Sequence, residues 1–126
     1  MKICIFGAGA IGGYMGGRMA RAGINVSLVA RGPHLSAMQQ NGLTIEDEDG
    51  RQTLEITATD DPYSLGPQDY VIISVKAISL AGANIAPLLG ENTVVVTAMN
   101  GIPWWYYYGL PDGERHASLE SVDPGG

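Results

Sequence analysis

Residues 3–12 of the chain read ICIFGAGAIG. The short apolar run Ile3–Phe6 ends in glycine, which is typical of a buried strand in a parallel sheet. A helix is predicted from about residue 10 to Ala22, and Gly23 ends it. Between strand and helix, Gly7-Ala8-Gly9-Ala10-Ile11-Gly12 has the spacing G-x-G-x-x-G. A strand, this turn and a helix, in that order, are the context in which such glycines hold a dinucleotide.

The three glycines of the motif have different predicted roles. Gly7 permits the tight turn, Gly9 lets a pyrophosphate approach the backbone, and Gly12 lets the helix pack closely on the strand. Free amides at the helix start, with the positive end of the helix dipole, then hold the phosphates. The predicted cofactor-binding residues of this turn are Gly7, Ala8, Gly9, Ala10, Ile11 and Gly12. The alternative interpretation is a glycine-rich turn that binds no ligand.

The predicted helix has two stripes at helical spacing. One is apolar and the other has almost no side chains; they comprise Ile11, Met15, Met19 and Ala22, and Gly12, Gly16 and Ala20. Each glycine inside a helix costs roughly 1 kcal/mol relative to alanine. A helix with several of them must gain from close approach of its backbone to a sheet or a ligand.

The rest of the chain alternates strands and helices. Strands are predicted at Val26–Ala30, 69–77 and 92–101, and helices at 33–42 and, weakly, at 79–89. Residues 43–58 predict a hairpin around Asp49-Gly50, with one apolar face formed by Leu43, Ile45, Leu54, Ile56 and Ala58. This order predicts an α/β fold with a parallel sheet covered on both faces, a Rossmann-like doubly wound sheet. The pattern stops after Gly101, so the doubly wound fold is expected to be incomplete.

Arg31 follows the second strand, about twenty residues beyond the glycines. An acidic residue at this place accepts hydrogen bonds from ribose hydroxyls and favours NAD, whereas a guanidinium can clamp a 2′-phosphate with two charge-assisted bonds. No Asp or Glu precedes Glu46. The sequence therefore predicts NADP as the cofactor. The alternative is a solvent-facing arginine at a strand end.

Two further polar residues follow predicted strands. Lys76 ends the strand of residues 70–75, and Asn100 follows the strand of residues 92–97. Ligands of open parallel sheets bind outside the carboxyl ends of the strands. Residues 7–12, Arg31, Lys76 and Asn100 all fall at such ends, so they are predicted to surround one crevice. An exposed lysine and a turn-forming Asn-Gly are the alternatives for the last two.

Charge and composition exclude several classes of protein. The net charge is −6, which disfavours a nucleic-acid binder, although residues 1–45 contain four basic residues and no acid, as suits a small anion. No apolar run of about 18 residues predicts a membrane span, and the N-terminus does not resemble a signal peptide. A single cysteine, Cys4, fits a core position in a cytoplasmic protein.

Other candidate site residues have simpler interpretations. Glu46–Asp49 is expected to be a solvated turn, so no metal site is predicted. His34 and His116 are expected on the surface. The aromatic run 104–108 is interpreted as the wall of a pocket or an interface.

With these residues established, the chain resembles the N-terminal domain of ketopantoate reductases (2-dehydropantoate 2-reductases) over roughly residues 1–103. The resemblance rests on Gly7–Gly12, Arg31, Val75-Lys76 and Asn100-Gly101, in that order. It implies that Gly7, Gly9 and Gly12 bind the pyrophosphate and that Arg31 binds the 2′-phosphate. It also implies catalytic-site positions for Lys76, beside the cofactor, and Asn100, between the nicotinamide end and the substrate. The implied reaction is hydride transfer from NADPH to a small 2-oxo acid, 2-dehydropantoate, in pantothenate biosynthesis.

The chain also departs from that family. By the resemblance, residues 1–126 correspond to the NADP-binding domain, and the helical domain that supplies the general acid in the family is expected to be missing. We therefore expect a cofactor-binding part that is inactive alone and that self-associates through an exposed sheet edge. A stand-alone NADP-binding sensor module and another NADP-dependent hydroxy acid dehydrogenase are the alternatives.

Overall fold

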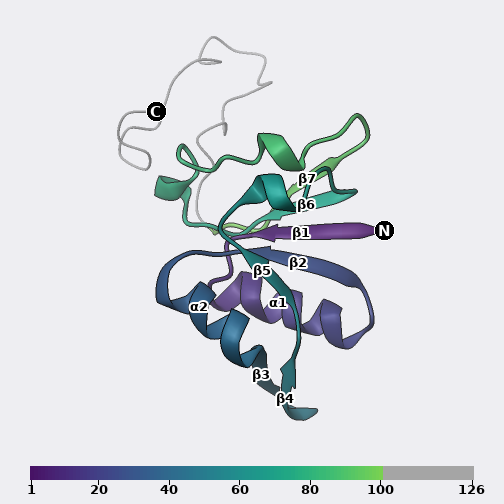
Figure 1. Cartoon of the computed structure of the whole chain (residues 1–126), viewed down its shortest axis with the longest axis vertical. Helices are drawn as coiled ribbons and strands as arrows, with labels where there is room; N and C mark the ends of the chain where they lie inside the picture. The colour runs from purple at the N-terminus through teal and green to yellow at the C-terminus, as the bar shows by residue number, and fades with distance from the viewer. Residues whose placement is uncertain (101–126) are drawn as a thin grey trace.

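The computed structural model describes residues 1–100, and its centre is a five-stranded sheet in which every paired strand runs parallel. The strands lie in the order β5-β2-β1-β6-β7 (Figure 1). Their bounds are β1 (Lys2–Phe6), β2 (Asn25–Val29), β5 (Thr57–Thr59), β6 (Tyr70–Ile73) and β7 (Val94–Thr97). The predicted Rossmann-like parallel sheet is confirmed. The predictions for Gly101, the aromatic run 104–108 and His116 lie outside the described residues.

The chain reverses direction across the sheet at β1. It first moves outward through β2 to β5, and then returns to place β6 on the other side of β1. The carboxyl ends of all five strands meet at one edge because the strands are parallel. The turn after β1 and the turn after β6 are therefore neighbours at the point where the strand order reverses, which is where open α/β sheets bind ligands.

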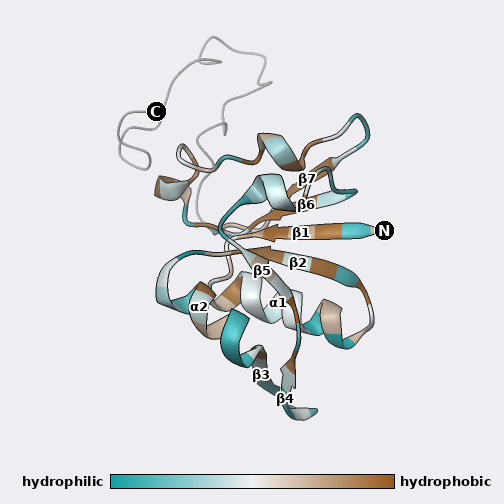
Figure 2. Cartoon of the chain, viewed as in Figure 1, coloured by the Kyte–Doolittle hydropathy of each residue, from teal (hydrophilic) through white to brown (hydrophobic). Residues whose placement is uncertain are grey.

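Both faces of the central strands are buried, as predicted. Ile3, Ile5 and Leu28 point to the face that carries α1 (Ala10–Arg21), and Cys4, Val29 and Val71 point to the opposite face with Leu88. This split follows from the alternation of side chains along a strand. Figure 1 shows α1 and α2 (Gly32–Asn41) together beside the β2 half of the sheet, and Figure 2 shows hydrophobic residues, in brown, along most of β1 and β2.

The predicted helix at 79–89 is wrong. Residues 77–89 instead contain two short 3-10 turns, η2 (Ala77–Ser79) and η3 (Ala86–Leu88). Gly82 and Asn84 have low helix propensity, and Pro87 lacks the amide that a continuing helix needs. These turns, rather than a helix, bring Leu88 onto the second face of the sheet.

The predicted hairpin is shorter than expected. Strands β3 (Leu43–Asp47) and β4 (Gly50–Leu54) pair antiparallel, and the chain then leaves to form β5, which pairs with β2 in the main sheet. Ile56 and Ala58 nevertheless pack in the same apolar cluster as Leu43 and Ile45. Apolar and polar residues alternate without a break from the end of β4 through β5. The alternation alone therefore did not show that β5 is a separate strand of the main sheet.

Strand β7 is exposed, although its composition predicted a buried strand. Val94, Val95 and Val96 are 48%, 41% and 42% exposed. Within residues 1–100, β7 is one of the two edge strands of the sheet and pairs with β6 alone. Self-association through this edge stays a prediction.

The small face of α1 is in close contact with its neighbours. The buried residues of α1 are Gly12, Gly13, Gly16 and Gly17. A Cβ on Gly16 would lie 2.6 Å from Leu28 Cδ2, and one on Gly12 would collide with the Gly7 carbonyl oxygen. The predicted close approach of helix to sheet is therefore confirmed. The predicted apolar stripe is wrong at both ends, because Ile11 is 58% exposed and Ala22, which follows α1, is exposed as well.

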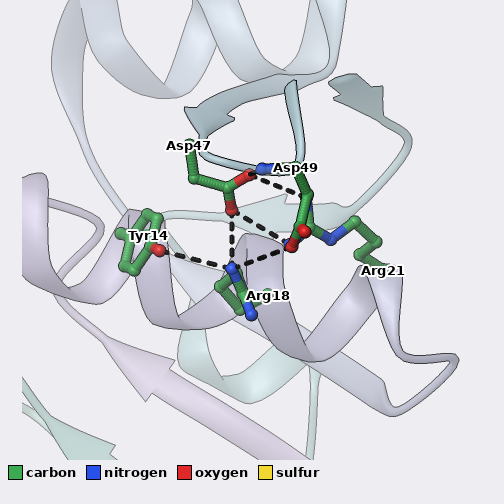
Figure 3. A network of polar contacts seen from close by, with 5 residues as sticks. All are labelled: Tyr14, Arg18, Arg21, Asp47 and Asp49. Atoms are coloured by element: carbon green, nitrogen blue, oxygen red, sulfur yellow. Dashed lines mark hydrogen bonds and ion pairs between the residues drawn. The ribbon is translucent and has the colours of Figure 1, made fainter. Parts of the chain in front are cut away.

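An ion-pair network joins α1 to the hairpin (Figure 3). Asp47 Oδ2 lies 2.7 Å from Arg18 Nη1 and 2.9 Å from Arg21 Nη2, and Asp49 Oδ2 lies 2.9 Å from Arg21 Nη2. Hydrogen bonds from Arg21 and then Arg18 lower the pKa of Asp47 to about 2. The interpretation of Glu46–Asp49 as a merely solvated turn is wrong for Asp47, whose side chain is 6% exposed. Two of the basic residues of the N-terminal third are thus used by the fold.

Gly12→Ala is expected to lower the free energy of unfolding by about 1–3 kcal/mol, because the new methyl group meets backbone that cannot move aside. Alanine's higher helix propensity offsets about 1 kcal/mol at most. Urea denaturation measures the change. Gly9→Ala is the matched control, since a Cβ there has no neighbour within 4 Å. Equal stability of the Gly12 variant and the wild type would contradict the packing.

Asp47→Asn is expected to reduce stability near pH 7 and to remove part of its pH dependence. The folded-state pKa of Asp47 lies below its ordinary value of 3.8, so its contribution is present above pH 3.8 and is lost as the pH falls toward about 2. Denaturant midpoints of wild type and variant between pH 2 and pH 7 should converge on acidification. Glu48→Gln, on the same turn, is the control. A constant difference between Asp47→Asn and the wild type over this range would contradict the network.

Candidate functional site

The turn after β1 is compressed against the turn after β6. Gly7 has φ +109, in the region that favours glycine, and a Cβ there would lie 2.8 Å from Val75 Cγ1 and 3.0 Å from the Val75 amide nitrogen. The Gly7 amide donates to the Val29 carbonyl oxygen at 2.9 Å. Gly7 is therefore required by both its backbone conformation and the lack of space, which extends its predicted role in the tight turn.

Each carbonyl of the glycine loop, residues 7–9, accepts a hydrogen bond from a different part of the chain. Ser74 Oγ, just after β6, donates to the Gly7 carbonyl oxygen at 2.6 Å. His34 Nε2, on α2, lies 2.7 Å from the Ala8 carbonyl oxygen, and the Gly13 amide of α1 donates to the Gly9 carbonyl oxygen at 2.7 Å. The acceptors of the loop are thus occupied by the protein.

The backbone amides of the same loop, unlike its carbonyls, are not all used by the protein. Within residues 1–100, the amides of Ala8 and Gly9 have no hydrogen-bond acceptor. Gly9 caps α1 without a side chain, the first turn of α1 has no acidic residue, and a Cβ added to Gly9 would have no neighbour within 4 Å. The first amides of a helix lack intrahelical acceptors and lie at the positive end of its dipole. This combination is a ready anion-binding site.

A cavity of about 490 Å³ joins the loop to Arg31. Its lining includes Gly7, Ala8 and Gly9 together with Arg31, the residue before α2. Arg31 is exposed, and within the described residues its guanidinium has no ion-pair partner. The structure therefore brings together the two predicted parts of the site that are about twenty residues apart in sequence.

Two carboxylates in the same cavity were missed from the sequence. Asp60 and Asp61 follow β5, which lies beside β2, so they line the cavity with Arg31. Asp61 is held in a turn, because its Oδ1 accepts from the Tyr63 amide at 3.0 Å. The absence of acids before Glu46 therefore did not imply an acid-free cavity. The missing signal was β5 itself, which had been assigned to the hairpin.

Lys76 and Asn100 lie at matching positions just beyond the adjacent strands β6 and β7. Ile73 of β6 pairs with Thr97 of β7, and Lys76 and Asn100 are each the third residue beyond this pair. Both are exposed at the carboxyl edge of the sheet, and neither lines the cavity among residues 1–100. Of the motif residues, Gly12 serves packing, Ala10 lines a second cavity, and Ile11 lines neither.

His34 and Cys4 both lie where the sequence placed them. His34 is exposed, as expected of a surface residue, and it also bonds the glycine loop and lines the cavity. Cys4 is a buried core residue, as expected; burial raises the pKa of its thiol to about 11, partly opposed by a hydrogen bond with Ser27. Such a thiol is a poor nucleophile.

Residues 1–100 contain neither a metal-binding cluster nor a helix that could cross a membrane. In this part of the chain, no cluster of three or more His, Cys, Asp or Glu side chains is arranged to hold a metal ion. None of its helices has the length and apolar character that a membrane span needs.

Comparisons with known proteins agree on one family. A family model described as ketopantoate reductase PanE/ApbA matches residues 3–103. The 2-dehydropantoate 2-reductase of Mesorhizobium japonicum is 49% identical to this chain over 100% of the chain and 40% of that protein. A crystal structure of a Ralstonia solanacearum protein assigned as a ketopantoate reductase matches with a TM-score of 0.86 and 47% identity, over 99% of this chain and 39% of the other.

A different activity is represented among the solved structures. D-mandelate dehydrogenase in complex with NADH matches with a TM-score of 0.67 and 27% identity, over 81% of this chain and 32% of the other. The chain thus spans about 40% or less of the length of these relatives. The family model covers most of the sequence, including the glycine loop, Arg31, Lys76 and Asn100. The chain belongs to the ketopantoate reductase family of oxidoreductases.

Proposed function

We propose that residues 1–126 form the NADP-binding domain of an NADPH-dependent reductase that converts 2-dehydropantoate to pantoate, a step of pantothenate biosynthesis. The observation that carries this proposal is the shared cavity, which both the glycine loop and Arg31 line. The 2-dehydropantoate 2-reductase of M. japonicum, at 49% identity, supports the substrate class. A small 2-oxo acid is therefore the proposed substrate.

The chain's own groups would divide the cofactor's phosphates between them. The pyrophosphate would lie on the unpaired amides at the start of α1, where the dipole favours negative charge. The 2′-phosphate would lie against Arg31, whose planar fork can donate two parallel hydrogen bonds to it. With the loop carbonyls already bonded to Ser74, His34 and Gly13, no unpaired carbonyl of this loop would face the phosphates.

Lys76 and Asn100 are proposed to act at the reacting end of the same crevice. Their matched positions beyond β6 and β7 support this assignment. Bound NADPH would supply the hydride for the keto carbon of the substrate. Lys76 would lie beside the cofactor, and the Asn100 amide would hydrogen-bond both the nicotinamide end and the substrate, which fixes their relative orientation.

A second candidate is an NADH-dependent 2-hydroxy acid dehydrogenase. Asp60 and Asp61 line the cavity, and a carboxylate there can accept hydrogen bonds from ribose hydroxyls. D-mandelate dehydrogenase, which binds NADH, has a related structure. A stand-alone NADP-binding module would use the same cavity without turnover. Comparing the two cofactors separates the first two candidates.

Arg31→Ala is expected to weaken NADPH binding about 10- to 100-fold and to leave NADH binding within about twofold, because charge-assisted hydrogen bonds contribute about 1.5–3 kcal/mol. Fluorescence titration with both cofactors measures the effect. Arg51→Ala removes the same charge from the exposed strand β4 and is the control. Equal affinities for NADPH and NADH in the wild type would favour the second candidate and contradict the role of Arg31.

The 126 residues are proposed to bind cofactor without completing the reaction, because the family resemblance assigns the general acid to a separate helical domain. NADPH oxidation with 2-dehydropantoate, followed at 340 nm, should not exceed the rate without protein. Turnover by this polypeptide would contradict that proposal and would place the acid within the chain.

A further inference from the structure

His34 is a polar residue of the site that has no part in the proposed binding of the cofactor's phosphates. It lies in the first turn of α2, three residues after Arg31, and its Nε2 is 2.7 Å from the Ala8 carbonyl oxygen. Two cavities, of about 490 and 450 Å³, meet here, and among residues 1–100 they share Gly9 and His34. The imidazole thus stands beside the loop at the boundary between them.

The hydrogen bond between His34 and the Ala8 carbonyl restrains one peptide group of the glycine loop. A carbonyl oxygen can only accept, so Nε2 must carry the hydrogen, and it does so in the protonated ring and in one neutral tautomer. The Ala8 carbonyl and the Gly9 amide belong to one trans peptide plane and point in opposite directions. A bond that fixes the carbonyl therefore fixes the direction of the Gly9 N–H as well.

The Gly9 peptide needs such a restraint. Gly9 has no side chain, a Cβ added to it would meet nothing within 4 Å, and glycine adopts a wide range of backbone angles. The Ala8 side chain is buried, which anchors one end of the peptide but leaves its rotation to the hydrogen bond. Without the imidazole, the plane can rotate and change the direction of the Gly9 N–H.

We propose that His34 is a positioning residue: by donating Nε2–H to the Ala8 carbonyl, it holds the Gly9 amide toward the phosphate cavity. The same bond ties the glycine loop to the helix that begins beside Arg31, and so sets the spacing between the two phosphate-binding regions before a ligand enters. The identity of the ligand, though not the restraint on the peptide, rests on the proposed function.

The binding test compares a ligand that needs both regions with one that needs Arg31 alone. His34→Phe removes the donor, His34→Gln supplies another, and Gln40→Ala changes an exposed residue of the same helix. His34→Phe should raise the NADPH Kd roughly two- to tenfold and leave the Kd of adenosine 2′-monophosphate unchanged, with His34→Gln intermediate and Gln40→Ala like the wild type. An equal loss for both ligands, or no loss for NADPH, would overturn the proposal.

A second measurement needs no ligand. In ¹⁵N-labelled protein, the Gly9 amide should give one sharp signal in the wild type and in Gln40→Ala, and a broadened or doubled signal in His34→Phe, as slow rotation of the peptide predicts. An unchanged Gly9 signal in His34→Phe would overturn the role of His34. Failure of the wild type to bind NADPH would contradict the proposed function and leave this measurement to decide on the restraint.

Discussion

The close contact between the turn after β1 and the turn after β6 is the constraint on which the site depends. Gly7 lies against the Val75 backbone, and Gly12 lies against Gly7, so three segments meet with no room for a methyl group. Ser74 completes the contact through its bond to the Gly7 carbonyl. Because the backbones are this close, α1 begins directly above the sheet edge and presents its first amides to the crevice. The packing of the fold and the geometry of the anion site are therefore one arrangement.

The charges of the N-terminal third are divided between structure and ligand. Arg18 and Arg21 pair with Asp47 and Asp49, and these pairs hold the hairpin on α1. The positive field inferred for residues 1–45 is consequently smaller than their composition suggested, and Arg31 is the basic side chain that lines the cavity among the described residues. Its charge is accompanied there by Asp60 and Asp61. The preference for NADPH or NADH then depends on which of these charges binds the adenosine ribose. Arg31 would favour a 2′-phosphate, and a carboxylate would favour the ribose hydroxyls.

Local requirements made part of this site predictable from sequence. The roles of Gly7, Gly9 and Gly12 are predictable because each position favours glycine for a local reason. These reasons are a tight turn, room for a ligand to approach the backbone, and close packing, and they recur at a fixed spacing. The position of Arg31 at the site is predictable because the length of a βαβ unit sets where the second strand ends. His34 was missed because its contact with Ala8 spans 26 residues and depends on how α2 is placed. Asp60 was missed because β5 pairs with β2, and alternation of apolar residues does not reveal a strand's partner.

The most direct test of the central claim is a crystal structure of this chain with bound NADPH. The account predicts pyrophosphate oxygens within hydrogen-bonding distance of the amides at the start of α1, and the 2′-phosphate in a two-bonded contact with Arg31. A ribose held by Asp60 or Asp61 with the guanidinium of Arg31 turned away, or a pyrophosphate bound elsewhere, would contradict it.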